Sequence, residues 1–247
     1  MFLKYAVSLV LIAVLMSSCA TQNLFKTPEN IKSDSAFFTR DSNYQYIIQK
    51  DDKISVSVWD NDDLSVGSVY GEYNSNEVYG KWLMVDANGE IMVPKLGNKK
   101  VAGLTVIDAE VMLKKDLAKL LVNPIVKLKV LNKEVTVLGE LKSPGHFLLE
   151  KENNSLVEVL GKAGDFDFYA DKKNIRVIRT VGNEVKTVRI DLTTYDNLYA
   201  KNIQIHPGDV IYVPAKNGKQ WDKRSGSTII PATAVITTIA VLANLFK

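Results

Sequence analysis

The chain has 247 residues, of which 46% are hydrophobic and 24% are charged, an ordinary balance for a globular protein. Its formal net charge of +3 is too small to indicate a nucleic-acid partner. The single cysteine excludes an internal disulfide framework and any metal site with several cysteine ligands. We therefore expect one or two domains with hydrophobic cores and no bound metal ion.

Residues 1–18 have the pattern of a signal peptide, in which Lys4 is followed by an apolar segment of about a dozen residues, too short to span a membrane. The small residues before Cys19 resemble a bacterial lipobox, in which the thiol is acylated and becomes the new N-terminus. We expect lipidation at Cys19. Because Ala20 rather than aspartate follows it, we expect the lipid to reach an outer membrane. Residues 19–43 are polar and unpatterned, which indicates a tether.

Residues 44–132 are predicted to form a small α+β unit. Apolar residues alternate over residues 54–58, as in a half-buried strand. The dipeptide Asn88-Gly89 between two apolar runs predicts a β-hairpin, because both residue types tolerate positive φ. Thr105 has the position of a helix N-cap, and a second alternating strand follows over residues 125–131.

Residues 133–214 are predicted to form a second unit. Ser155 and Glu158 have the spacing of a capping box at the start of a short helix. Two alternating strands flank the turn Gly182-Asn183, and a final strand leads to Pro214. A sheet of mixed hairpins with one short helix across it suggests a β-grasp domain.

Both units contain an acidic turn that leads into a strand, over residues 50–54 and 206–211. In each turn we expect a carboxylate to accept hydrogen bonds from backbone N–H groups of the same turn, which is a structural role. The two histidines, His146 and His206, each lie beside a Pro-Gly pair. We interpret them as turn residues rather than metal ligands.

These motifs resemble, in order, a known pair of domains. The polysaccharide export domain of Wza-type capsule and exopolysaccharide translocons of the outer membrane is similar to residues 85–94, 101–105 and 123–126. The soluble-ligand-binding β-grasp (SLBB) domain that follows it in the family is similar to residues 139–145, 155–164 and 207–214. The resemblance covers residues 44–214 and includes one β-grasp segment.

The resemblance implies a ring-shaped homo-oligomer in the periplasm, continued through the outer membrane by C-terminal helices. The exported polysaccharide would leave through the lumen, after transfer from an inner-membrane synthesis and co-polymerase complex. The resemblance implies no catalysis and no cofactor.

The chain also lacks the motifs of phosphate-binding loops, serine-hydrolase elbows and zinc proteases. The acidic pair Asp165 and Asp167 lies beside aromatic residues, and we interpret both carboxylates as solvated. The neighbouring aromatic residues either pack in the core or stack on sugar rings. The possible glycan contacts are Phe166, Phe168 and Tyr169.

Residues 228–246 carry no charge over about 19 positions, which as a helix would span roughly 28 Å, about one bilayer core. We therefore expect a transmembrane helix over residues 228–247, after a basic linker over residues 215–227. One stripe of this helix is apolar and is expected to face lipid: Val235, Ile239, Leu242 and Phe246. A stripe about 200° away is small and weakly polar and is expected to face neighbouring helices: Thr233, Thr237, Ala240 and Asn244.

Two functions remain open. In the first, the chain is an outer-membrane lipoprotein that forms an oligomeric channel for polysaccharide export. In the second, it is a monomeric outer-membrane lipoprotein that binds glycan or scaffolds other proteins, and the C-terminal helix is only an anchor. A channel requires helices that pack side by side, whereas an anchor requires only hydrophobicity.

Overall fold

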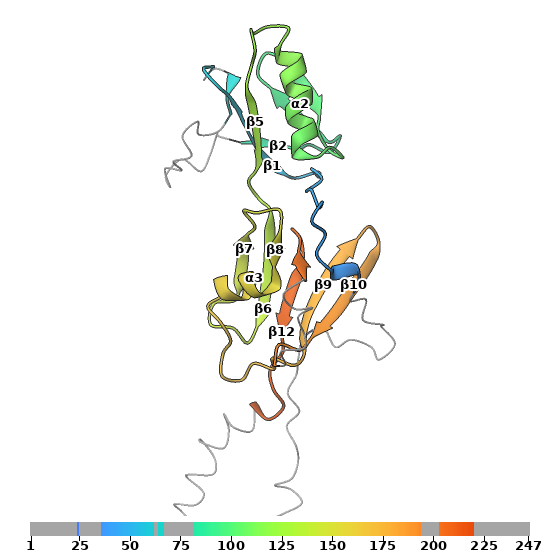
Figure 1. The fold of residues 1–247 in the computed structure, drawn as a ribbon, viewed down its shortest axis with the longest axis vertical. Helices are drawn as coiled ribbons and strands as arrows, with labels where there is room; N and C mark the ends of the chain where they lie inside the picture. Colours follow the sequence, from blue (N-terminus) through green and yellow to red (C-terminus); the bar gives the residue numbers. More distant parts are fainter. Residues whose placement is uncertain (1–23, 25–35, 62–63, 67–81, 194–202, 220–247) are drawn as a thin grey trace, which may run out of the picture.

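The structure is a computed structural model that describes residue 24 and residues 36–61, 64–66, 82–193 and 203–219. Two separate hydrophobic cores divide this part of the chain into two domains, which follow one another along the long axis of the molecule (Figure 1). The first core is built from residues between Tyr46 and Val130. The second core is built from residues between Val135 and Val213, together with Phe38.

Several expectations lie outside the described residues. These are the signal peptide, lipidation at Cys19, and the two stripes of the segment over residues 228–246. Within the described ranges, no helix is both long enough and apolar enough to cross a membrane.

The first domain places one helix against a small antiparallel sheet. The sheet has the strand order β2-β1-β5, and a separate hairpin consists of β3 and β4. The elements are β1 (Lys53–Val58), β2 (Leu83–Met84), β3 (Glu90–Val93), β4 (Gly97–Lys100), α2 (Val106–Leu117) and β5 (Val126–Val130). Strands β1 and β5 alternate between buried apolar and more exposed polar residues, which is the pattern that predicted them.

Helix α2 begins where the sequence indicated. The Thr105 hydroxyl accepts a hydrogen bond from the backbone N–H of Asp108 at 3.1 Å, which satisfies one of the free donors at the helix start. The stripe of Ala109, Leu113 and Leu117 is buried in the first core. The helix ends at Leu117, before the stop that the sequence indicated at Asn123-Pro124.

The hairpin predicted at Asn88-Gly89 is wrong in its strand pairing. The turn itself is present, because the Gly89 N–H donates to the carbonyl of Asp86 at 2.9 Å. The Asp86 N–H also donates to the Glu90 carbonyl at 2.9 Å, but β2 pairs with β1 and β3 pairs with β4, so these strands form no ladder with each other. The turn is also stabilised by the Asp86 carboxylate, which accepts from the N–H groups of Asn88 and Glu90, both at 2.8 Å. Only Gly89 of the dipeptide takes positive φ, at +78°.

The second domain contains a five-stranded mixed sheet in the order β10-β9-β12-β6-β7. The central strands β6 and β12 are parallel, and the other neighbours are antiparallel. The elements are β6 (Glu134–Gly139), β7 (Gly145–Leu148), β8 (Asn154–Ser155), α3 (Leu156–Lys162), β9 (Ile175–Val181), β10 (Glu184–Ile190), β11 (Gln204–Ile205) and β12 (Val210–Val213). The described domains thus mix helices and strands, as expected.

Two local predictions in the second domain are confirmed. Ser155 and Glu158 form both hydrogen bonds of a capping box at the start of α3. Strands β9 and β10 form a hairpin around Gly182-Asn183, in which Val181 pairs with Glu184. Helix α3 packs on the sheet because its apolar stripe, which begins with Leu156, lies in the second core.

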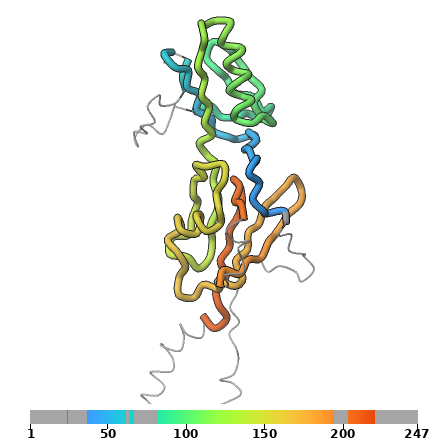
Figure 2. Tube along the Cα trace, in the orientation of Figure 1, coloured from blue at the N-terminus to red at the C-terminus, as the bar shows by residue number. Residues whose placement is uncertain are grey.

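The residues before the first domain pack on the second domain. We call residues 36–46 the N-terminal strap, which begins with the short 3-10 helix η1 (Ala36–Phe38). The Phe38 side chain is 0% exposed in the second core, and Thr39 forms a β-bridge with Ile203. The strap then rises to the first domain (Figure 2). We expect residues 19–43 to form a tether. The end of this segment that the structure describes packs on the second domain.

Candidate functional site

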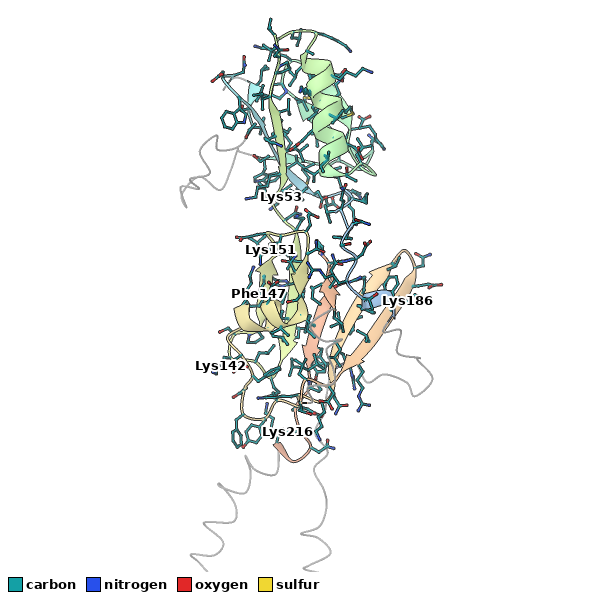
Figure 3. The ribbon with its side chains drawn as sticks, viewed as in Figure 1. Lys53, Lys142, Phe147, Lys151, Lys186 and Lys216 are labelled. Atoms are coloured by element: carbon teal, nitrogen blue, oxygen red, sulfur yellow. The ribbon has the colours of Figure 1, made fainter. Side chains whose placement is uncertain are left out.

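A polar cleft with a volume of about 540 Å³ lies in the second domain, beside the N-terminal strap. It is assembled from the strap, the loop that leads into α3, and strand β11. Its lining residues are Arg40, Lys151, Glu152, Asn153, Asn154, Ser155, Glu158, Ile203 and Gln204. Lys151 lies at the end of this domain that faces the first domain (Figure 3).

Gln204 organises the floor of the cleft and is only 3% exposed. Its Oε1 accepts the backbone N–H of Asp41 from the strap at 2.8 Å, and its Nε2 donates to Oδ1 of Asn153 at 2.9 Å. Strand β11 brings it there by pairing with β8, where Gln204 lies opposite Ser155. The side-chain amides of the cleft are thus fixed by contacts between distant segments.

The charges of the cleft are mixed in sign. Lys151 forms an ion pair with Glu158 at 3.1 Å, and the pKa of Glu158 is lowered mainly by the backbone N–H of Ser155 and then by Lys151. The Ser155 hydroxyl serves the helix cap rather than a base. The cleft therefore presents hydrogen-bond donors and acceptors to a polar ligand, and it lacks the nucleophile–base geometry of a hydrolase.

Glu152 connects the cleft to the joint between the two domains. Its carboxylate accepts the backbone N–H of Tyr46 at 3.0 Å and the Lys133 ammonium at 2.7 Å. The Tyr46 hydroxyl donates to Asp52 at 2.9 Å, and Asp52 also accepts the N–H of Gln49 within its own turn at 2.8 Å. Burial raises the pKa of Asp52 and, more strongly, the pKa of Tyr46.

The second acidic turn contains a buried ion pair. Asp209 is 0% exposed and accepts two bonds from the Arg179 guanidinium, both at 2.7 Å, and one from the N–H of His206 at 2.8 Å. Arg179 also donates to the carbonyl of Gln204 at 2.8 Å, and its Cζ lies 4.8 Å from the centroid of the Phe38 ring. In both domains the acidic turn has the structural role that the sequence predicted.

Comparison with known families gives the decisive observation. The chain matches the family described as "Polysaccharide biosynthesis/export protein" over residues 40–131 and the SLBB domain over residues 133–213. The chain belongs to the Wza-type polysaccharide export family. The first domain is thus the export domain, and the second is the SLBB domain.

Two relatives bear names that agree with this family. The chain is 27% identical over 205 residues to the "EPS I polysaccharide export outer membrane protein EpsA" of Ralstonia solanacearum. This alignment covers 77% of this chain and 53% of the relative. It is 28% identical over 206 residues to the protein of the same name from Ralstonia nicotianae (strain ATCC BAA-1114 / GMI1000). This second alignment covers 77% of this chain and 52% of the relative. The chain spans about half the length of these relatives.

Within this member of the family, the aromatic residues predicted as possible glycan contacts are not among the residues that line the polar cleft. Phe166 is partly buried against the core of the SLBB domain and forms a β-bridge with Leu141. Phe168 is 81% exposed and lies edge-on to Tyr169, with ring centroids 5.1 Å apart. The glycan contact of these residues stays a prediction, and packing explains Phe166 alone.

The sequence analysis did not single out Arg179 and did not predict the cleft, although it assigned Ser155 and Glu158 of the cleft lining to a capping box. A signal for Arg179 was nevertheless present, because in β9 it falls in phase with the inward-facing residues Ile175 and Val177. A charged residue on the buried face of a strand indicates a buried partner. The cleft has no comparable signal, because its lining comes from segments that are far apart in the sequence.

His206 predicts a pH dependence of the stability of this chain. Its ring stacks on Tyr44 at 3.9 Å, and burial, followed by the charge of Arg179, lowers the pKa of His206 to about 4. Because the pKa is lower in the folded protein, acid protonates the unfolded chain first, and stability is lost as pH falls from about 6.5 towards 4. We expect the free energy of unfolding to fall by about 1 kcal/mol from this group between pH 7.5 and pH 5, after allowance for solvent screening.

Urea unfolding of the full chain at the two pH values measures this effect. His206→Phe, which keeps a ring against Tyr44, is expected to lose less stability on acidification than the unmodified protein. His146→Gln, at an exposed histidine, is the control and should follow the unmodified protein. An identical acid loss in all three proteins would show that His206 is not responsible.

Proposed function

We propose that this chain is an outer-membrane lipoprotein that forms an oligomeric channel and exports capsular or extracellular polysaccharide from the periplasm to the cell surface. The observation that carries the proposal is the order of the two domains, since the export domain is followed by the SLBB domain after a single residue, Asn132. Relatives named as outer-membrane polysaccharide export proteins align with this chain over 205 and 206 residues.

The joint between the domains supports a conduit. The chain crosses between the domains twice, at the strap and at Asn132, and hydrogen bonds fix both crossings. The Asn132 side chain accepts the N–H of Lys53 at 2.8 Å and donates to the carbonyl of Asp51 at 3.1 Å. The bonds of Tyr46 and Lys133 to Glu152 fix the strap side. The bond from Tyr46 to Glu152 joins the two domains, and we expect it to restrict their relative orientation, as stacked rings around one lumen require.

The polar cleft supports a saccharide as the transported polymer. Sugar hydroxyl groups both donate and accept hydrogen bonds, and three lining side chains that are not buried, those of Lys151, Asn153 and Glu158, provide matching groups. Export would require no catalysis by this chain and no cofactor. The polymer would arrive from an inner-membrane synthesis and co-polymerase complex, the partner that the family resemblance implies.

Deletion of this chain in its host tests the proposal directly. We expect surface polysaccharide to be lost and polymer to accumulate in the periplasm, and expression of the full chain should restore export. Surface polysaccharide that persists at normal levels after deletion would refute an export role. A strictly monomeric full chain in detergent, with its tail intact, would instead favour the monomeric glycan-binding or scaffolding lipoprotein.

The proposed C-terminal helix predicts a second result. Thr233→Leu combined with Thr237→Leu enlarges the face expected to contact neighbouring helices, so we expect crosslinked oligomers to decrease while membrane attachment persists. Val235→Leu combined with Ile239→Leu, on the face expected to contact lipid, is the matched control and should leave the oligomer intact. Chemical crosslinking in detergent measures the difference. An unchanged oligomer in the threonine variant would mean that the periplasmic domains alone hold the ring.

A further inference from the structure

At the end of the SLBB domain opposite the export domain, one loop is hydrogen-bonded to the segment that follows β12. We call residues 165–171 the base loop. The N–H of Lys216 donates to the carbonyl of Tyr169, and the N–H of Asp171 donates to the carbonyl of Pro214, both at 2.8 Å. A β-bridge also joins Ala170 to Ala215. The base loop is therefore part of the surface from which the C-terminal segment leaves.

Phe168 lies in this loop and is 81% exposed. Its neighbours on either side are anchored, since Asp167 donates its N–H to the carbonyl of Glu140 at 3.1 Å and Tyr169 accepts from Lys216. The Phe168 N–H is itself bound to the Asp167 carboxylate at 2.7 Å. The backbone thus holds a large aromatic ring in an outward position, although burial of that ring is favourable.

Lysine side chains lie at the same end of the domain as the aromatic residues of the base loop. Lys219 Nζ lies 6.0 Å from the centroid of the Tyr169 ring, and exposed lysines occupy the same end of the domain at Lys142 and Lys216 (Figure 3). Aromatic rings and lysines are the residues that gather at membrane–water interfaces. The loop also carries acidic residues, so its surface is not strongly basic, and the aromatic ring is the feature that indicates lipid.

Both expected membrane attachments leave from this end. The N–H of Leu24 donates to the hydroxyl of Tyr212 at 2.8 Å, and Tyr212 is next to the last residue of β12. Cys19 precedes Leu24 by five residues, since 24 − 19 = 5, and so lies at most about 18 Å away along an extended chain. Lys219 precedes residue 228 by nine residues, or at most about 32 Å. The export domain lies at the opposite end (Figure 3).

We propose that the base loop lies against the lipid headgroups of the membrane and that the Phe168 ring enters the interfacial layer. This contact rests on the membrane attachment that the proposed function includes. The contact would hold the SLBB domain directly on the bilayer. The long axis of the molecule would then point away from the membrane. The base loop would then be a third membrane contact, besides the lipid and the C-terminal helix.

An environment-sensitive fluorophore on the full chain tests the proposal. Phe168→Cys, labelled with a nitrobenzoxadiazole dye, is reconstituted in vesicles of phosphatidylethanolamine and phosphatidylglycerol. Met92→Cys is the matched control, because Met92 is also apolar and is 67% exposed, but lies on β3 of the export domain. The unmodified chain, treated with the same dye, reports any label on Cys19. We expect the dye at position 168 to emit at shorter wavelength and to be quenched severalfold more by nitroxide-labelled lipids than the dye at position 92.

Three results would overturn the proposal, and they differ in meaning. If the chain floats with the vesicles but iodide in the buffer quenches both positions equally, the base loop lies in water. If position 168 is protected from iodide but is not quenched by nitroxide lipids, protein covers it. If the full chain does not float with the vesicles, the membrane attachment in the proposed function fails as well.

Discussion

Replacing Gly139 with alanine is expected to lower the free energy of unfolding by about 3 kcal/mol or more. Gly139 ends β6 with φ of +102°, which strains any residue that has a Cβ atom. A Cβ built there would lie 1.9 Å from the carbonyl oxygen of Val213 and 2.8 Å from its carbonyl carbon. Because the clash is with backbone atoms, β6 and β12 would have to separate at their C-terminal ends, where Gly139 pairs with Val213. Urea unfolding followed by fluorescence measures the loss.

Two other glycines separate the possible causes. Gly145→Ala should change stability by less than about 0.5 kcal/mol, because its φ is not positive and its Cβ would meet no atom within 4 Å. Gly97 has φ of +70° in open space, so Gly97→Ala should show backbone strain alone, about 1 kcal/mol. Equal stability of Gly139→Ala and Gly145→Ala would contradict the close approach of β6 to β12 at Gly139.

Replacing Asp209 with alanine is expected to destabilise the protein by about 3–5 kcal/mol, because it leaves the Arg179 guanidinium buried without its carboxylate. The N–H of His206 would lose its acceptor as well. Replacing both members of the pair, as Arg179→Met with Asp209→Leu, should recover much of this loss, since no buried charge remains. The free energies of Arg179→Met, Asp209→Leu and the double variant, measured together, give the coupling of the pair.

An exposed ion pair provides the control for this experiment. Glu184 pairs with Lys186 at 2.9 Å, but the Glu184 side chain is 73% exposed. Glu184→Ala should therefore change stability by less than about 1 kcal/mol. Equal losses in Asp209→Ala and Glu184→Ala would contradict the buried position of the Arg179–Asp209 pair.

The parts of the fold that sequence predicted are those decided by neighbouring residues. The caps at Thr105 and Ser155 depend on a residue three positions away, and the alternation in β1 follows from one buried face. The pairing of β6 with β12 is different, because Val137 and Ile211 lie opposite each other although more than 70 residues separate them. No local pattern distinguishes this partner from other apolar strands.

The Asn88-Gly89 error has the same origin. The dipeptide does form a turn, but which strands pair beyond it depends on β1 and β4, which lie outside the sequence window that indicated a hairpin. The polar cleft escaped prediction for a related reason. It forms only when the strap reaches Gln204, a contact between residues 41 and 204 that composition and spacing do not reveal.

The aromatic residues of the base loop show the limit in another way. Their sequence fits core packing and surface recognition equally well, and the structure separates the two, since Phe166 faces the core and Phe168 faces outward. Exposure of one ring among several is decided by the backbone bonds of the base loop to residues 214–216. Those bonds form only in the folded domain.

The docking of Phe38 has a consequence for the order in which the chain matures. The ribosome synthesises the chain from its N-terminus, so Phe38 is made well before the strands that enclose it, the last of which ends at Val213. The export domain can complete its own core from residues 46–130 while Phe38 still lacks its final environment. The strap can therefore close only on a chain that has been synthesised through β12. Closure of the strap thus reports that synthesis of the SLBB domain is complete.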